Sequence, residues 1–364
     1  MKITIRADAS TEMGSGHVMR CLTLAELLRE KGASVTFITR KYDGNLNGLI
    51  SKKGFHVLGL NKTVKSKIDK TENLNISDDY KEWLGVGESR DAEDTIHAIG
   101  DEKPDWLIVD HYSLSEKWEK TIRPCVKNIM VIDDLANRHH DCDLLVDQNW
   151  FENIETRYDG LIPTGCTKLL GPKYALLRPE FAEARKSLKQ RNGIIDRIFV
   201  FFGGSDLHNL TAMTLRALSL PELDHLHVDV VIGENNTHRD EIQQLTESRN
   251  LTHLHVQVDD MVAIMVKADL AVASGGVNTW ERMCLDLFSM VITTANNQIP
   301  TIENLNAHRH VKFLGDHKKV NQSSISAHIN EYVYNMSEIK RNKMLIDGLG
   351  TNRVSKLLSN NMAR

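Results

Sequence analysis

The chain has 364 residues, of which 41% are hydrophobic and 26% charged, and its formal net charge at pH 7 is -4. A chain of this length exceeds what one hydrophobic core usually organises, so we expect two domains. The near balance of charges excludes a general electrostatic attraction to nucleic acid or to acidic lipid.

The five cysteines are widely spaced and contain no C-x-x-C pair; they are Cys21, Cys125, Cys142, Cys166 and Cys284. An odd number without metal or redox spacing predicts free thiols in a reducing compartment. The sequence begins with a strand-like segment rather than a basic and apolar leader, and it has no run of 18 apolar residues. We therefore expect a cytoplasmic protein that does not bind membranes.

The opening of the chain combines an alternating, strand-like segment (residues 3–10) with a glycine-rich loop and an amphipathic helix within residues 11–32. His17 and Arg20 stand where this helix begins. Backbone N–H groups converge at a helix N-terminus and the helix dipole favours anions, so a phosphorylated ligand is the expected neighbour. His17 then suits acid or base chemistry near neutral pH; the alternative is a tight turn whose histidine only caps or packs.

The same loop argues against a dinucleotide cofactor. Gly14 and Gly16 allow a ligand to approach the backbone closely. The third glycine of the G-x-G-x-x-G fingerprint is missing, however, which disfavours a nicotinamide or flavin. We expect no cofactor.

Short apolar segments alternate with helical patterns along the rest of the chain. They fall at residues 34–39, 56–60, 105–110, 128–133 and 143–148, and then at 197–204, 227–233, 254–258, 268–274 and 289–294. Near-continuous apolar strands separated by helices are typical of parallel sheets covered on both faces. The sequence thus predicts two α/β domains, joined by the charged stretch 179–193, with the polar stretch 62–91 as a surface excursion.

Two predicted strands of the second half end in small residues. Gly203, Gly204 and Ser205 follow the first, and Ser274, Gly275, Gly276, Asn278 and Thr279 follow the second. Ligands bind at the carboxyl ends of strands in open parallel sheets, and small residues expose backbone N–H groups to a diphosphate. Glu281 follows at a spacing suited to ribose hydroxyls; the alternative is a solvated carboxylate on the helix face.

Polar clusters also end three predicted strands of the first half. They are Asp110, His111 and Tyr112; Asp133 and Asp134 with Arg138; and Asp147, Gln148 and Asn149. Such residues either line a ligand cleft or form turns and helix caps, and the pattern leaves both alternatives open. The paired aspartates have no second ligand set, and His139, His140 and Cys142 lack zinc spacing, so we expect no metal.

The motifs together resemble one known family, the UDP-2,4-diacetamido-2,4,6-trideoxy-beta-L-altropyranose hydrolases of pseudaminic acid biosynthesis. In chain order the motifs are IRADAS, GSGHVMRCLTLA, DWLIVDHY, VIDDLANR, CDLLVDQN, LGPKYALLRPEF, FFGGSD, ASGGVNTWERM, ANNQ and DGLGTNRV. The resemblance implies a GT-B fold, in which two Rossmann-like domains face each other across a cleft. We place the sugar and catalytic domain at residues 1–185 and the UDP-binding domain at 186–364.

The resemblance also implies roles for individual residues. His17 corresponds to the base that activates water for inverting attack at the anomeric carbon, and Glu281 to the ribose or uracil contact. The substrate-side residues are Gly14, Gly16, Arg20, Tyr112, Asn297 and Gln298. The UDP-side residues are Gly203, Gly204, Ser205, Ser274, Gly275, Gly276, Asn278 and Thr279.

Three other functions fit the same motifs. A glycosyltransferase would admit an acceptor hydroxyl in place of water, because the fold alone does not distinguish the two. An epimerase would return a UDP-sugar without releasing UDP, and a sensor would bind without turnover. In each case we expect a small-molecule UDP-sugar as partner, and no nucleic acid, membrane or obligate protein partner.

Overall fold

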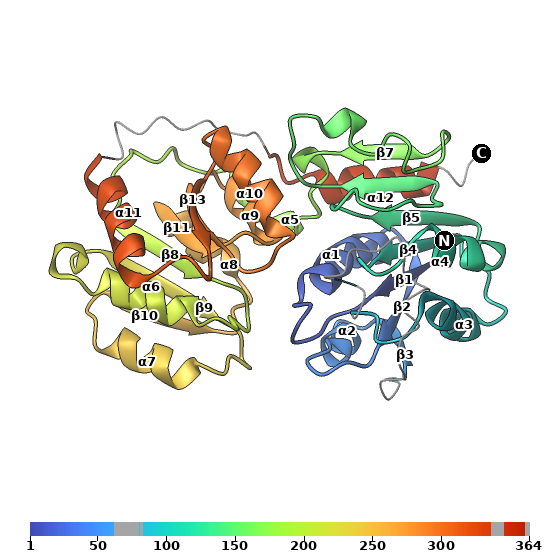
Figure 1. The fold of residues 1–364 in the computed structure, drawn as a ribbon, viewed down its shortest axis with the longest axis horizontal. Helices are drawn as coiled ribbons and strands as arrows, with labels where there is room; N and C mark the ends of the chain where they lie inside the picture. The colour runs from blue at the N-terminus through green and yellow to red at the C-terminus, as the bar shows by residue number, and fades with distance from the viewer. Residues whose placement is uncertain (62–79, 81–82, 336–345, 361–364) are drawn as a thin grey trace. The chain divides into compact units, whose positions relative to one another are not determined.

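A computed structural model describes residues 1–61, 80, 83–335 and 346–360 of the chain (Figure 1). The described chain forms two compact units. Met1–Leu177 and Leu349–Arg364 make up the first, and Arg178–Gly348 makes up the second. Each unit is built on one parallel sheet, which confirms the predicted α/β class.

The first unit contains a seven-stranded sheet in the order β3-β2-β1-β4-β5-β6-β7, and each neighbouring pair is parallel. The strands are β1 (Lys2–Ala7), β2 (Ser34–Arg40), β3 (His56–Leu60), β4 (Trp106–Asp110), β5 (Asn128–Ile132), β6 (Leu144–Asp147) and β7 (Thr167–Leu170). The order reverses between β1 and β4, and in sheets of this kind ligands bind at the carboxyl ends of strands beside such a reversal.

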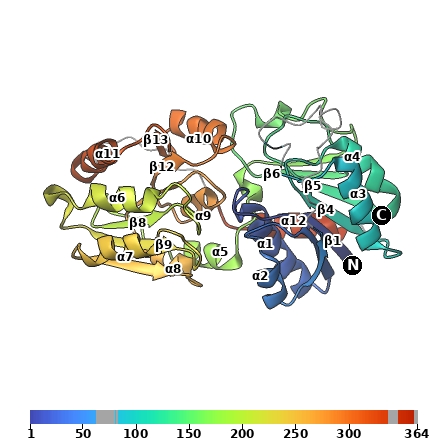
Figure 2. The same cartoon turned by 60° about the horizontal axis from the view of Figure 1, so that its bottom comes forward.

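Helices cover both faces of this sheet (Figure 2). They are α1 (Gly16–Glu30), α2 (Asn47–Lys52), α3 (Glu88–Ile99), α4 (Glu116–Ile122) and α12 (Gly350–Asn360). One apolar core joins Ile108 of β4 to α1, α2 and α12, and a second joins Leu107 and Val109 to α3 and α4. Successive strand residues point to opposite faces of a sheet. Ile108 therefore packs on one face and Leu107 and Val109 on the other, so both faces are apolar, as the near-continuous hydrophobic strands predict.

The second unit contains a six-stranded parallel sheet in the order β10-β9-β8-β11-β12-β13. Its strands are β8 (Arg197–Phe201), β9 (His227–Ile232), β10 (Thr252–Val256), β11 (Leu270–Ser274), β12 (Ser289–Thr293) and β13 (Lys312–Asp316). Its helices are α5 (Pro179–Lys186), α6 (Leu210–Leu218), α7 (Arg239–Glu247), α8 (Met261–Lys267), α9 (Asn278–Cys284), α10 (Gln298–Ala307) and α11 (Gln322–Asn335).

The predicted strands all form, and two further strands, β7 (Thr167–Leu170) and β13 (Lys312–Asp316), were not predicted. Both lie at a sheet edge. The first two residues of β7 are exposed, and every residue of β13 is half-buried. An edge strand lacks the continuous apolar run that marks a strand buried on both faces, so the pattern gave no signal there.

The division into units differs from the expected boundary between residues 185 and 186. Helix α5 belongs to the second unit, and residues 349–360 return to the first. Val354 and Leu358 of α12 are fully buried in the first core, and the Trp106 indole N–H donates to the Leu358 carbonyl at 3.1 Å. The packing of α12 therefore closes the first unit with residues from the end of the chain.

The polar stretch 62–91 is only partly described, since residues 62–79 and 81–82 lie outside the described residues. Its last four residues are not a surface excursion, because they form the first turn of α3. Asp91 is fully buried and accepts hydrogen bonds from Arg6, Arg40 and Trp118. In the sequence Asp91 looks like a polar loop residue. In the structure it connects three elements of the first unit, because its partners lie on β1, β2 and α4.

Membrane-spanning potential and cysteine state can be read from the described residues. Across the described helices, none has both the length and the apolar character that a bilayer crossing requires. All five cysteines are free thiols, and the sulfur atoms of Cys142 and Cys166 lie 3.5 Å apart.

The role of α12 predicts the effect of a core substitution. Leu358→Ala removes a fully buried side chain from the first unit and should lower its free energy of unfolding by about 2–5 kcal/mol. Chemical denaturation followed by tryptophan fluorescence measures this, because Trp83, Trp106, Trp118 and Trp150 all lie in the first unit. Lys356→Ala, on the exposed side of the same helix, is the control. Equal midpoints for the two variants would contradict the packing of α12.

Candidate functional site

The carboxyl edge of the first sheet brings His17 against Asp110, which are 93 residues apart in the sequence. His17 lies in the first turn of α1 and Asp110 ends β4. The His17 Nδ1 to Asp110 Oδ1 distance is 2.6 Å, and the His17 side chain is only 9% exposed. A carboxylate accepts, so Nδ1 donates its proton to Asp110 and Nε2 becomes the ring nitrogen able to take a proton.

Arg20 fixes the carboxylate that orients His17. Its guanidinium donates to both oxygens of Asp110, at 2.6 and 2.7 Å, and to Asp134 at 3.0 Å. Burial opposes ionisation of Asp110, but the charge of Arg20 and the hydrogen bonds from Arg20 and His17 outweigh it and hold the pKa of that carboxyl well below its usual range. Asp110 is thus a permanently charged, immobile partner for the imidazole.

Aromatic rings form the wall beside the imidazole. The Tyr112 ring meets His17 edge-on with ring centroids 4.6 Å apart, and Trp83 stacks on Tyr112 at 5.6 Å. The Tyr112 hydroxyl donates to Asp134 at 2.6 Å, and the residue is 3% exposed. Tyr112 therefore joins the network that holds His17 and Arg20.

The other polar strand ends of the first unit were predicted either to line a ligand cleft or to form turns and helix caps. Asp133 accepts from the backbone N–H groups of Leu135 and Ala136 and pairs with Arg138, so it organises a turn. His111 is 3% exposed and its ring accepts from the Ser113 N–H, so it also holds a turn. Asp134, by contrast, belongs to the network around Arg20.

Asp147, at the end of β6, is a buried carboxyl that stays protonated at neutral pH. Burial raises its pKa to about 8, the charge of Asp134 adds to the effect, and Arg157 opposes it. The Tyr158 hydroxyl lies 3.1 Å from Asp147 Oδ2 and 3.0 Å from Asp133 Oδ2. One proton on Asp147 therefore lets a single hydroxyl bridge two buried carboxyl groups.

Several loops at the carboxyl edge of the second sheet lie close to their neighbours. Gly204 lies against Gly233, where a Cβ atom would meet the Gly204 backbone at 2.8 Å. The loop after β12 joins α10, since the Thr294 N–H donates to the Gln298 side chain at 2.9 Å. At Gly275 a Cβ atom would lie 2.7 Å from the Ile302 side chain, so any larger residue would force that side chain to move.

Arg282 donates hydrogen bonds to several residues that were predicted to bind UDP. It is buried within α9 and donates to the Ser274 carbonyl and to the side chains of Asn278 and Thr279. Burial lowers the pKa of Arg282 to about 10, and the charge of Glu281 opposes that shift. These contacts hold the glycine loop, residues 274–279, from its buried side. Thr279 itself is 1% exposed.

Glu281 stands on the same helix with its side chain 20% exposed and 4.0 Å from Arg178. Burial raises its pKa, although Arg178 lowers it. It is not the fully solvated carboxylate of the alternative interpretation. Asn297 directly precedes α10, and Gln298 is its first residue.

The structure thus gathers the predicted residues into two groups, one at the carboxyl edge of each sheet. Gly14, Gly16, His17, Arg20 and Tyr112 share the first edge. The second edge carries Gly203, Gly204, Ser205, Ser274, Gly275, Gly276, Asn278, Thr279, Glu281, Asn297 and Gln298. Sequence reasoning missed Trp83, His208 and His317; the last follows the edge strand β13, which was also missed.

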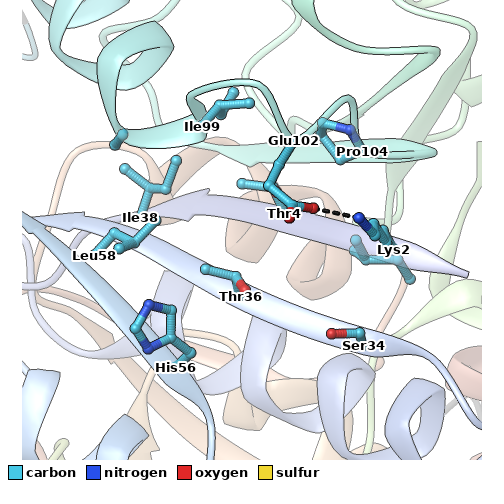
Figure 3. Close-up of a pocket in the computed structure, with 12 residues that line it drawn as sticks. Lys2, Thr4, Ser34, Thr36, Ile38, His56, Leu58, Ile99, Glu102 and Pro104 are labelled. Carbon is cyan, nitrogen blue, oxygen red and sulfur yellow. Dashed lines mark hydrogen bonds and ion pairs between the residues drawn. The ribbon is translucent and has the colours of Figure 1, made fainter.

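Two further observations concern other possible sites. A hollow of about 430 Å³ lies where β1, β2 and β3 begin, lined by Thr4, Thr36 and His56 among others, and therefore away from His17 (Figure 3). Within the described part of the chain, no three His, Cys, Asp or Glu residues come together as a metal ion would require.

Comparison with known proteins finds relatives along most of the chain, although no family model matches it. An uncharacterized protein of Methanocaldococcus jannaschii is 27% identical over 80% of this chain, which spans 55% of that relative's length. The UDP-2,4-diacetamido-2,4,6-trideoxy-beta-L-altropyranose hydrolase of Campylobacter jejuni is 24% identical, covering 83% of this chain and 94% of the relative. The spore coat polysaccharide biosynthesis protein SpsG of Bacillus subtilis is 23% identical over 98% of both chains.

Solved structures resemble the whole fold. MurG of Acinetobacter baumannii has a TM-score of 0.60 at 12% identity and covers 99% of both chains. Arabidopsis thaliana UGT89C1 complexed with UDP has a TM-score of 0.62 at 10% identity, over 98% of this chain and 99% of that one. The UDP-GlcNAc 2-epimerase of Neisseria meningitidis, bound to UDP-GlcNAc, has a TM-score of 0.58 at 14% identity, over 99% of this chain and all of that one.

The fold class is therefore GT-B, with two parallel-sheet α/β domains. Within that class the chain is similar over most of its length to the Campylobacter hydrolase and to SpsG, and its motifs resemble those of the hydrolase family.

The buried Asp147 predicts a measurable pH dependence of stability. The unfolded chain ionises this carboxyl near pH 4, whereas the folded protein keeps its proton until about pH 8. Stability therefore falls as pH rises through this window and levels off above it. Asp147→Asn removes this dependence, so its stability relative to wild type should improve by up to about 1.4 kcal/mol per pH unit between pH 5 and 8.

Urea denaturation at several pH values measures this difference. Asp101→Asn, at an exposed position, is the control. Parallel pH profiles for wild type and Asp147→Asn would show that Asp147 ionises normally in the folded protein.

Proposed function

We propose that the protein hydrolyses UDP-2,4-diacetamido-2,4,6-trideoxy-beta-L-altropyranose to the free sugar and UDP, with inversion at the anomeric carbon. The observation that carries the proposal is the His17 and Asp110 pair, with a distance of 2.6 Å, at the carboxyl edge of the first sheet. A histidine oriented by a buried carboxylate is a general base ready to activate water.

The reaction follows from the roles of these groups. Nε2 of His17 takes a proton from a water molecule as the water oxygen bonds to the anomeric carbon. The bond from that carbon to the phosphate oxygen breaks, and UDP leaves with the electron pair. Because water attacks opposite the leaving group, the sugar is released with the inverted configuration. Asp110 stabilises the imidazolium that forms, while Arg20 keeps Asp110 ionised and in position.

We assign the nucleotide to the carboxyl edge of the second sheet. Gly203, Gly204 and Ser205, with the loop at residues 274–279, form the diphosphate region, and Glu281 binds the ribose or uracil. Asn297 and Gln298 contact the sugar, as do Gly14, Gly16 and Tyr112 from the first unit. Preorganised backbone donors stabilise the charge that develops on the departing diphosphate.

The relatives support a UDP-sugar as substrate. The Campylobacter relative is named for this hydrolysis, and the Bacillus relative for spore coat polysaccharide biosynthesis. We accordingly place the reaction in the biosynthesis of a surface sugar, and the protein in the cytoplasm where nucleotide sugars are made.

A glycosyltransferase is the second candidate, because MurG and UGT89C1 share the fold. The same His17 and Asp110 pair would deprotonate an acceptor hydroxyl as readily as water. The two functions separate by product, since the transferase forms a glycoside only when an acceptor is supplied and the hydrolase releases free sugar without one.

Replacing the base tests the proposal directly. His17→Asn should reduce release of UDP from the UDP-sugar by about 10²- to 10⁴-fold, because general base catalysis is lost. Affinity for UDP should stay within about twofold of wild type, since the nucleotide is assigned to the second unit. A coupled assay of UDP release and a calorimetric titration with UDP provide the two measurements.

The matched control is His97→Asn, an exposed histidine on α3. It should leave both quantities unchanged. Near wild-type turnover by His17→Asn would remove His17 from its role as the base.

A further inference from the structure

An imidazole pair at the carboxyl edge of the second sheet has no role in the reaction described above. The rings of His208 and His317 stack face to face, with centroids 3.7 Å apart and planes inclined by 16°. His208 lies in the loop after β8, three residues beyond Ser205, and His317 directly follows β13. Two strands that are not neighbours in the sheet therefore place their histidines together.

Hydrogen bonds tie this pair to the loops assigned to the diphosphate. The His208 ring bonds to the backbone of Thr294, and the backbone N–H of His317 donates to the Thr293 carbonyl at 2.9 Å. Thr294 in turn accepts and donates hydrogen bonds with Gln298. The Gln298 side chain borders Gly275 and Gly276, so one chain of contacts runs from the imidazoles to the glycine loop.

Two carboxylates lie near the imidazole pair, those of Asp206 and Asp316, and both also accept hydrogen bonds from backbone N–H groups. Both oxygens of Asp206 accept from backbone N–H groups that begin α6, at 3.0 and 2.8 Å. Asp316 accepts from the Lys318 N–H, and its Oδ2 lies 3.3 Å from Nδ1 of His317. That nitrogen is buried and has no hydrogen-bond partner of good geometry. Both aspartates favour a proton on His208.

The stacked arrangement resists full protonation in the absence of an anion. Burial lowers the pKa of His208, the charge of His317 lowers it further, and Asp206 and Asp316 oppose the shift. A second positive charge at 3.7 Å repels the first. An anion of several charges beside the rings reverses this balance, because it stabilises the protonated form.

Charge complementarity identifies the anion. None of the residues assigned to the diphosphate above has a cationic side chain, yet a nucleoside diphosphate carries between two and three negative charges near neutral pH. We infer that His208 and His317 form a proton-linked subsite for the diphosphate, taking up a proton as the nucleotide binds. This inference rests on the proposed function, because it assumes that a nucleoside diphosphate occupies the second edge.

The affinity for UDP therefore depends on pH, because the two histidines take up a proton when UDP binds. UDP should bind more tightly as pH falls from 8.5 to 6.5, by at most tenfold per pH unit for one linked proton. The protonated pair also stabilises the charge on UDP as it leaves the sugar. His208 and His317 thus act on the leaving group, whereas His17 acts on the attacking water.

Calorimetric titration of the full chain with UDP tests the inference. Performing it at pH 7.5 in two buffers of different ionisation enthalpy gives the number of protons taken up. We expect clear uptake by wild type, and a fall towards zero in His208→Asn and His317→Asn. Each variant should lose about five- to tenfold in UDP affinity at pH 6.5 and less than twofold at pH 8.5.

Two controls isolate the effect. His225→Asn, at an exposed site ahead of β9, should behave as wild type, and uridine should bind without proton uptake. The terminal phosphate of UDP also titrates, near pH 6, but it contributes equally in every variant.

The outcomes separate this inference from the proposed function. Proton uptake that is the same in wild type and both variants overturns the inference and leaves the hydrolase proposal intact. Absence of UDP binding overturns both. Uptake that depends on the two histidines supports the inference even if the sugar is not hydrolysed, a result that would contradict only the hydrolase.

Discussion

The contact between Asp110 and Arg20 is the constraint on which the first unit's chemistry depends. Asp110 ends a fully buried strand, and a carboxylate there needs a charged, hydrogen-bonding partner to remain ionised. Arg20 supplies this from the first turns of α1 through two short hydrogen bonds. The same helix carries His17 three residues earlier, so the geometry that satisfies the buried charge also sets the tautomer and direction of the imidazole.

The second unit uses a buried cation in a comparable way. Arg282 on α9 draws the Ser274 carbonyl, Asn278 and Thr279 together behind the glycine loop. Glycine at 275 then allows Ile302 to pack directly against the backbone. In each unit a buried arginine therefore holds polar groups at the carboxyl edge of the sheet, where we propose that the substrate binds. Rigidity of this kind lets a site stabilise developing charge without first reorganising.

The sequence predicted the fold class well, because apolar strands alternating with helices leave few other arrangements. The sequence also singled out His17 as a candidate base, since a histidine after a glycine-rich loop has a recognisable local pattern. Its partner Asp110 was one of several polar strand ends, and only the strand order brings it to His17. Similarly, β7, β13 and the return of α12 depend on tertiary packing that local pattern does not encode. Asp91 looked like part of a polar loop because its three partners lie far away in sequence.

The most direct test of the account is proton NMR of the reaction with the UDP-sugar, following the anomeric signals of substrate and products from the first minutes. The account predicts free 2,4-diacetamido sugar appearing first as the inverted anomer, with an equal amount of UDP and no acceptor present. A product that first retains the original configuration, or a sugar that stays attached to UDP, would contradict water attack assisted by His17.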